Sequence, residues 1–176
     1  MKSPATLDTR PTSDRLRETL FNILAPRIAG ARFLDLCAGS GAIGIEALSR
    51  GAVHATFVDR SRRMCQLINS NLELCRVTSG DAAVITAEAA TFLKRHREKV
   101  GEAWDIVYYD PPYADDYSSV LGLFADHAEL LSPSGLLIVE HDRRKQLPEA
   151  PDNLETLRTL KQGDSSLSFY GPRTTV

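Results

Sequence analysis

The composition of the chain is that of an ordinary globular protein: 176 residues, 43% hydrophobic and 25% charged. Its length suits one well-cored domain, so we expect a single domain over residues 1–176, with a loose arm at residues 1–9. The net charge of −2 is unlike the basic excess of nucleic-acid-binding domains and leaves only local basic patches for such a role. No apolar run approaches the roughly 18 residues that span a bilayer, and a signal peptide is not apparent, which predicts a cytoplasmic protein with no membrane partner.

The three cysteines, Cys37, Cys65 and Cys75, are odd in number and show no C-x-x-C spacing. This pattern indicates neither a disulfide framework nor a zinc site. We therefore expect free thiols and no bound metal.

The segment RPTSDRLRETLFNIL predicts an amphipathic helix that ends near Pro26. Leu16, Leu20, Ile23 and Leu24 recur at helical spacing, and Thr12 or Ser13 suits the N-cap. Arg10, Arg15 and Arg17 lie at the entrance of this helix, where side chains and backbone amides can contact phosphates together. Solvated surface arginines are the alternative interpretation.

After this helix, strands and helices alternate. We expect strands from Phe33 and over His54–Val58, Ala82–Ala87, Trp104–Tyr109 and Gly135–Glu140, the last after the turn SPSG, and helices over Ile43–Arg50, Arg62–Cys75, a segment with Phe92 and Leu93, and Asp115–Leu131. Alternation of this kind predicts a parallel sheet with helices on both faces. Leu154–Leu160 and Ser165–Tyr170, joined by KQGD, predict an antiparallel hairpin. The expected fold is therefore α/β and Rossmann-like, with a mostly parallel seven-stranded sheet and a C-terminal antiparallel hairpin.

The stretch FLDLCAGSGAIGIEAL, from Phe33 to Leu48, carries the glycine spacing G-x-G-x-x-G of a ligand-binding loop. Asp35, at the end of the strand, would repel a pyrophosphate but attract a ligand with ammonium and sulfonium charges. About twenty residues on, Asp59 follows the next strand, where an acid accepts hydrogen bonds from ribose hydroxyls. Together these features favour S-adenosylmethionine over a dinucleotide, and the lack of a substrate domain also disfavours a dinucleotide oxidoreductase.

The fourth strand ends in the tetrapeptide Asp110-Pro111-Pro112-Tyr113. Ligands of open α/β sheets bind outside the carboxyl ends of the strands, so this tetrapeptide should lie beside the glycine loop. Two prolines stiffen the loop and remove two amide donors. A simple strand-ending turn is the alternative.

These motifs together resemble one family. DPPY is similar to the motif of class I S-adenosylmethionine methyltransferases that modify exocyclic amines of nucleic-acid bases. With RPTSDRLRETLFNIL, LDLCAGSGAIGIEALSRGA and SSLSFYG, the chain resembles the bacterial RsmD-type small-subunit ribosomal RNA guanine-N2 methyltransferases from Arg10 to Gly171.

The resemblance implies a division of roles among residues. Asp110 and the Pro111 carbonyl would accept hydrogen bonds from the amine, Tyr113 would stack on the base, and Glu88 with the Ala89 amide would bind the adenine of the cofactor. The implied sites are: catalytic, Asp110, Pro111, Pro112 and Tyr113; cofactor-binding, Asp35, Cys37, Ala38, Gly39, Ser40, Gly41, Asp59, Arg60, Glu88 and Ala89; substrate-binding, Arg10, Thr12, Arg15 and Arg17.

Three departures from the family pattern concern the N-terminus and the cofactor loop. Family members usually begin with a basic β-hairpin before the RPT segment, and only nine residues precede that segment here. Cys37 stands where the family often has Phe, and Glu88 where Asp is common. We therefore expect a family hairpin that is missing or shortened.

Two alternatives to a guanine-N2 methyltransferase stay open. An adenine-N6 methyltransferase acting on RNA or DNA would use the same DPPY motif, and a non-catalytic module could bind the cofactor or RNA. The expected partner is ribosomal RNA, naked or within a small-subunit assembly particle, and we expect the protein to act as a monomer.

Overall fold

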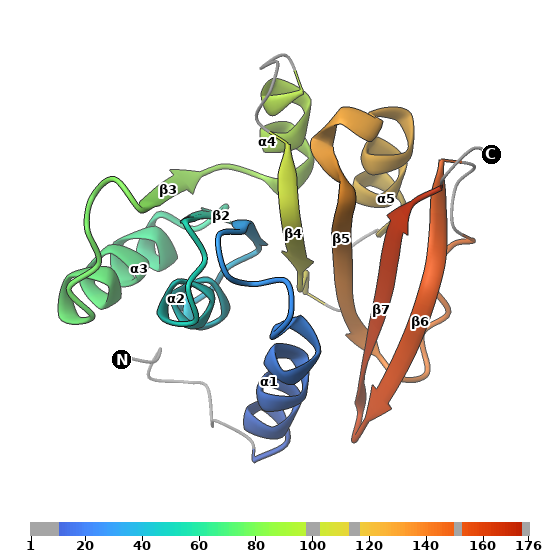
Figure 1. Cartoon of the computed structure of the whole chain (residues 1–176), viewed down its shortest axis with the longest axis horizontal. Coiled ribbons are helices and arrows are strands. Elements are labelled where there is room, and N and C mark those ends of the chain that lie inside the picture. The colour runs from blue at the N-terminus through green and yellow to red at the C-terminus, as the bar shows by residue number, and fades with distance from the viewer. Residues whose placement is uncertain (1–10, 98–102, 113–116, 150–152, 174–176) are drawn as a thin grey trace.

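The structure, a computed structural model, describes residues 11–97, 103–112, 117–149 and 153–173, with side chains from residue 14 onward. Within these ranges seven strands form one sheet in the order β3-β2-β1-β4-β5-β7-β6 (Figure 1). The strands are β1 (Arg32–Leu36), β2 (His54–Asp59), β3 (Ala82–Thr86), β4 (Trp104–Tyr109), β5 (Leu131–Asp142), β6 (Leu154–Gln162) and β7 (Ser165–Pro172), and the helices are α1 (Pro11–Leu24), α2 (Ala42–Ser49), α3 (Arg62–Leu74), α4 (Ala89–His96) and α5 (Tyr117–Asp126).

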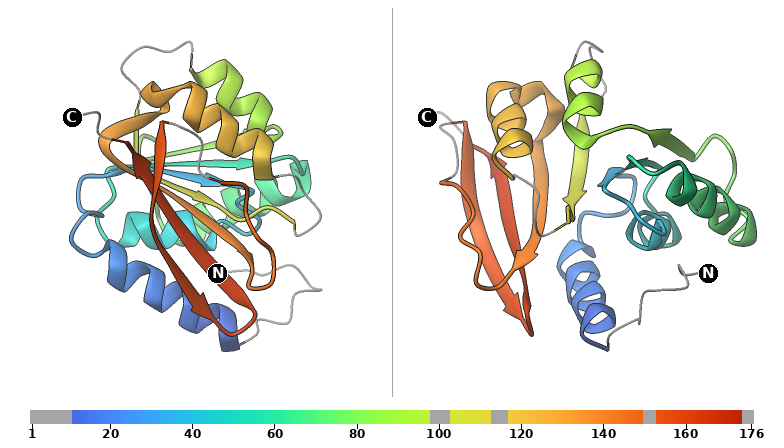
Figure 2. Two further views of the ribbon diagram at one scale, coloured as in Figure 1. Left: turned by 90° about the vertical axis from the view of Figure 1, so that its right-hand side faces the viewer. Right: turned by 180° about the vertical axis from the view of Figure 1, so that it is seen from behind.

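The sheet is parallel from β3 to β5 and antiparallel at its other edge. β3, β2, β1, β4 and β5 pair in parallel in that order, whereas β7 runs antiparallel to both β5 and β6. Figure 2 shows the β6–β7 hairpin at the edge of the sheet. The predicted fold class, with seven strands and a C-terminal antiparallel hairpin, is confirmed.

Helices cover both faces of the sheet, and each face has its own hydrophobic core. α1, α2 and α3 lie below the sheet in Figure 1, and α4 and α5 lie above it. The lower core joins side chains of α1, such as Leu20, to Phe57 and Phe169 of the strands. The upper core joins Leu121 of α5 to Val107 of β4. No helix in the described ranges is long and apolar enough to cross a bilayer.

Gly44 allows α2 to lie directly against β2. A Cβ atom at this position would be 2.3 Å from the Phe57 ring, which is closer than real Cβ atoms approach. The third glycine of the motif therefore serves helix–strand packing, as its spacing predicts.

The helix predicted over Asp115–Leu131 is too long. Within the described residues α5 ends at Asp126, and a 3₁₀ turn over Ala128–Leu130 leads into β5. β5 begins at Leu131, before SPSG and not after it, and its register against β4 shifts between Trp104 and Ile106. A Cβ at Gly135 would lie 2.9 Å from two backbone carbonyls, so the chain can close this irregularity only with glycine.

Other element boundaries differ from the predictions by one or two residues. Three strands extend two residues beyond their predicted ends: β5 to Asp142, β6 to Gln162 and β7 to Pro172. In β5 the extension reflects the pairing of Asp142 with Ser165 of β7. An antiparallel partner thus lengthens the strand beyond its apolar core, which composition alone does not indicate.

Candidate active site

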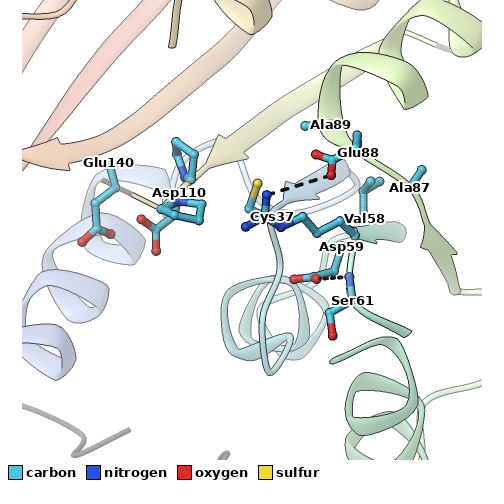
Figure 3. A pocket seen from close by; sticks show the side chains of 12 residues that line it. Cys37, Val58, Asp59, Ser61, Ala87, Glu88, Ala89, Asp110 and Glu140 are labelled. Carbon is cyan, nitrogen blue, oxygen red and sulfur yellow. Dashed lines mark hydrogen bonds and ion pairs between the residues drawn. The ribbon is translucent and has the colours of Figure 1, made fainter. Parts of the chain in front are cut away.

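The carboxyl ends of four parallel strands surround a pocket of about 360 Å³ (Figure 3). Residues at or just after the ends of β1, β2, β3 and β4 contribute to it, together with Glu140 near the end of β5, as expected for an open α/β sheet. Its lining consists of Cys37, Val58, Asp59, Arg60, Ser61, Ala87, Glu88, Ala89, Asp110, Pro111, Pro112 and Glu140.

Asp59 is held by backbone amides on both carboxylate oxygens. Gly39 N–H donates to Oδ2 at 2.9 Å, and Ser61 N–H donates to Oδ1 at 2.8 Å. Each oxygen keeps a further lone pair, because a carboxylate accepts about four hydrogen bonds in total. The half-buried carboxylate therefore has a fixed direction and can still accept hydrogen bonds from hydroxyls in the pocket.

Asn71 of α3 supports the glycine loop from below. Its side chain is fully buried, and Nδ2 donates to the carbonyl of Ser40 at 3.0 Å. The loop therefore has a second anchor besides Asp59. Ala38, Gly39, Ser40 and Gly41 belong to this loop but are not lining residues of the pocket.

Cys37, the first residue of the loop, lines the pocket and has a φ of 63°. The left-handed conformation costs a residue with a Cβ on the order of 1 kcal/mol. Such costs are found where the surrounding structure or a bound ligand requires the backbone geometry. This supports Cys37 as a ligand-contacting position.

The predicted adenine site lies after β3. Glu88 precedes α4 as its N-cap residue, and its carboxylate lies 4.0 Å from the guanidinium of Arg60. Both side chains are exposed, so this pair adds little stability and is free to rearrange around a ligand. Ala89 is buried and lines the pocket at the first turn of the helix, where backbone N–H groups have no partner within the helix.

Asp35 lies beneath the loop and is only 2% exposed. Its Oδ2 accepts from Gly44 N–H at 2.9 Å, which joins β1 to α2. Burial raises the pKa of Asp35 to about 8, the Gly44 hydrogen bond opposes the rise, and the charge of Asp59 adds to it. Asp35 does not line the pocket, so its direct contact with a cofactor stays a prediction.

Asp110 directly follows β4 and extends its alternation, so that it falls on the same side of the sheet as Tyr108. The packing around it, and then the charges of Glu140 and Asp35, raise the pKa of Asp110 above its usual range. The residue is nevertheless open to the pocket, and water there moderates this rise. Pro111 is buried and Pro112 exposed, which fixes the loop against the protein on one side.

The predicted substrate residues do not line this pocket. Arg15 is exposed on α1, and Arg17 lies 3.2 Å from Asp14 on the same helix. Thr12 belongs to the described backbone of α1, and its side chain, like Arg10 and Tyr113, falls outside the described residues. Their roles stay predictions.

Sequence reasoning missed three residues of this region: Asn71, Tyr108 and Glu140. Glu140 is the acid that ends the apolar segment GLLIVE, so the rule that directed attention to Asp59 and Asp110 would have found it. Asn71 is a polar residue within the buried stripe of α3, next to Leu72.

Among the described residues, no group of three or more His, Cys, Asp or Glu side chains is arranged to hold a metal ion.

Known proteins resemble the chain over nearly its whole length. The family described as "Conserved hypothetical protein 95" matches residues 1–171. Ribosomal RNA small subunit methyltransferase D of Escherichia coli K12 is 38% identical, over 92% of this chain and 78% of the relative, and its namesake in Haemophilus influenzae is 35% identical over 92% and 82%. The solved structure of the Escherichia coli protein yhhF shares 34% identity at a TM-score of 0.83, covering 99% of this chain and 92% of yhhF. The chain therefore belongs to this family, the RsmD family, as its motifs predict.

Proposed function

We propose that this chain is an S-adenosylmethionine-dependent methyltransferase that methylates the N2 amine of a guanine in small-subunit ribosomal RNA. One observation carries the proposal: Asp110 and Pro111 share a single pocket with Asp59 and Glu88 (Figure 3). The motif expected to bind an amine therefore lies next to two carboxylates, Asp59 and Glu88, that can accept hydrogen bonds from an adenosine. The names of the relatives supply the substrate class.

The residues after β1, β2 and β3 fit the cofactor. The fixed Asp59 carboxylate has lone pairs left for two ribose hydroxyls, and Glu88 with the Ala89 amide can bind the edge of an adenine. A Cβ at Gly39 would meet no protein atom within 4 Å, so the backbone there is open to a ligand. The bound cofactor supplies a methyl group activated by its sulfonium charge.

The DPPY loop activates the amine. An exocyclic amine is a poor nucleophile because its lone pair is delocalised into the base. Hydrogen bonds from its two N–H groups to the Asp110 carboxylate and the Pro111 carbonyl hold the nitrogen toward tetrahedral geometry and free that lone pair. Alignment supplies much of the rate, and no strong base is needed before transfer. As the N–CH3 bond forms and the S–CH3 bond breaks, the nitrogen gains a positive charge, and the Asp110 carboxylate that already accepts its N–H can take the surplus proton. Tyr113 stacks on the base, a contact worth roughly 1 to 3 kcal/mol.

RNA binds in part through the basic residues at the start of α1, namely Arg10, Arg15 and Arg17. The substrate is ribosomal RNA, either naked or within a small-subunit assembly particle. The enzyme acts as a monomer in the cytoplasm, and a chain with a net charge of −2 gains from ribosomal proteins that help to hold the RNA.

The decisive experiment incubates the purified protein and labelled S-adenosylmethionine with small ribosomal subunits, and with their naked RNA, from a cell that lacks the corresponding methyltransferase. Mass spectrometry of the digested RNA should identify N2-methylguanosine. N6-methyladenosine would establish the adenine alternative. Absence of any methylated nucleoside, with cofactor binding intact, would favour a non-catalytic binding module.

A further inference from the structure

The pocket contains a second carboxylate beside Asp110 that the proposed chemistry does not use. β4 and β5 pair in parallel, and the last pair in register joins Tyr109 to Val139, so Asp110 and Glu140 occupy the next equivalent positions. Figure 3 shows both carboxylates turned to the same side. Within the described part of the chain, neither one pairs with a lysine or an arginine.

Tyr108 fixes the direction of the Glu140 side chain. Its hydroxyl donates a hydrogen bond to Glu140 Oε2 from a buried position on the neighbouring strand. Burial, followed by the charges of Glu140 and Asp110, raises the pKa of Tyr108 well above its usual range, so the hydroxyl stays protonated and remains a donor. Oε1 of Glu140 has no hydrogen-bond partner among the described residues, which leaves an acceptor available to the pocket.

Two acceptors side by side distinguish guanine from adenine. The edge of guanine that carries the N2 amine also carries N1–H, so it presents donors at adjacent positions. Adenine presents its N6 amine next to N1, which is an acceptor. The lone pair of N1 would repel the lone pairs of a carboxylate placed opposite it. Neighbouring strands are roughly 4.8 Å apart, so one base edge can reach residues at the ends of both. Enzymes that act on a base outside its helix commonly bind this Watson–Crick edge.

We propose that Glu140 is the specificity residue of this site: its Oε1 accepts the N1–H of the target guanine while Asp110 accepts the N2 amine, and the Tyr108 hydroxyl holds Glu140 in the orientation that does so. This inference rests on the proposed function. It gives the chain a means of rejecting adenine that the DPPY motif alone does not contain.

The test uses a base that keeps the amine and lacks N1–H. The methylated guanine is first located with the wild-type protein, and two RNAs are then assembled by ligation, one with guanosine and one with 2-aminopurine riboside at that position. Each RNA is supplied either as naked RNA or within the small-subunit particle, depending on which form the wild type methylates. The wild type should favour guanosine in kcat/KM by at least about 100-fold, because a site built to accept a hydrogen bond strongly rejects an analogue without the donor.

Glu140→Gln should reverse or abolish this preference. The Tyr108 hydroxyl donates to the amide oxygen, so the amide NH2 turns toward the pocket, where it suits the N1 acceptor of 2-aminopurine. In the double variant Tyr108→Phe/Glu140→Gln, no Tyr108 hydroxyl orients the Gln amide at position 140. The preference for 2-aminopurine should therefore shrink, and the two RNAs should be methylated at nearly equal rates. Unchanged affinity for S-adenosylmethionine confirms that each variant is folded, and Glu140→Ala, which should also lose the preference, replaces Glu140→Gln if that variant is unstable.

The outcomes separate the two proposals. Failure of the wild type to methylate any guanine in the first step contradicts the proposed function. Equal methylation of the two RNAs by the wild type, or a Glu140 variant that keeps the wild-type preference for guanosine, overturns the inference and leaves Glu140 as a half-buried partner of Tyr108 only.

Discussion

The side-chain amide of Asn71 donates a 3.0 Å hydrogen bond to the carbonyl of Ser40 and so joins α3 to the glycine loop. Asn71→Ala removes this anchor and should weaken S-adenosylmethionine binding about fivefold, because a typical buried hydrogen bond contributes about 1 kcal/mol. Isothermal titration calorimetry measures the affinity. Asn69→Ala, an exposed change on the same helix, is the matched control and should bind normally. Equal affinities for the two variants would show that the loop needs no support from α3.

Asp59→Ala tests the expected ribose contact. The change removes a charged acceptor that two backbone amides hold in place, so cofactor affinity should fall by about 1 to 3 kcal/mol. Asp81→Ala, an exposed acid at the opposite end of β3, serves as the control in the same calorimetric titration. If both variants bind like the wild type, the ribose is held elsewhere.

The fold could be predicted from sequence because its signals are local. Apolar strands, amphipathic helices and turn residues alternate along the chain, and each pattern depends on a few neighbouring residues. The wrongly predicted boundaries are those that depend on contacts between residues far apart in the sequence. α5 ends at Asp126 although the apolar pattern continues, and β5 starts before SPSG because Gly135 lets the chain approach Trp104 of β4.

Residues of the candidate site could be predicted where a single acidic residue stands at the end of an apolar strand. Asp59 and Asp110 each follow an apolar strand, and the structure brings them to one pocket. Glu140 was missed although it follows the same rule, since its importance depends on β5 lying next to β4. Asn71 could not be assigned a role, because only the fold shows that a buried helix side chain reaches a loop 31 residues earlier.

The buried Asp35 should make stability depend on pH. Its pKa is raised from 3.8 to about 8, so the folded state retains a proton that the unfolded chain releases above about pH 4. The free energy of unfolding therefore falls as pH rises from about 4 to about 8, by up to about 1.4 kcal/mol per pH unit from this group. Asp35→Asn keeps an acceptor for Gly44 but cannot titrate. Urea denaturation between pH 5 and 8 should give a flatter curve for the variant, and parallel curves would contradict the assignment.

Arg15 and Arg17 of α1, with Arg10 just before it in the sequence, should govern the salt dependence of RNA binding. Replacing Arg10, Arg15 and Arg17 together with Ala should lower RNA affinity and reduce the slope against salt concentration by roughly one unit per lost phosphate contact. Fluorescence anisotropy at several salt concentrations measures this slope. Lys94→Ala/Arg95→Ala alters exposed charges on α4, across the sheet from α1, and should leave the slope unchanged. An unaltered slope in the triple variant would make these arginines solvated surface residues.

Asp110→Ala separates chemistry from cofactor binding at the DPPY loop. The change removes the acceptor for the amine but leaves the glycine loop, Asp59 and Glu88 in place, so S-adenosylmethionine should bind with nearly normal affinity. Methyl transfer should fall about 10² to 10³-fold, the usual cost of losing one preorganised polar partner. Single-turnover methylation at saturating cofactor measures the chemical step directly.

Tyr113 provides the contrast to Asp110 within the same tetrapeptide. Tyr113→Ala should act mainly on RNA affinity and base positioning, and Tyr113→Phe should be mild, because stacking needs the ring and not the hydroxyl. A distinct pattern is therefore expected: a rate defect at fixed RNA affinity for Asp110→Ala, and an affinity defect for Tyr113→Ala. Near-normal single-turnover rates in Asp110→Ala would show that this carboxylate does not activate the amine. The loop would then have a binding role alone.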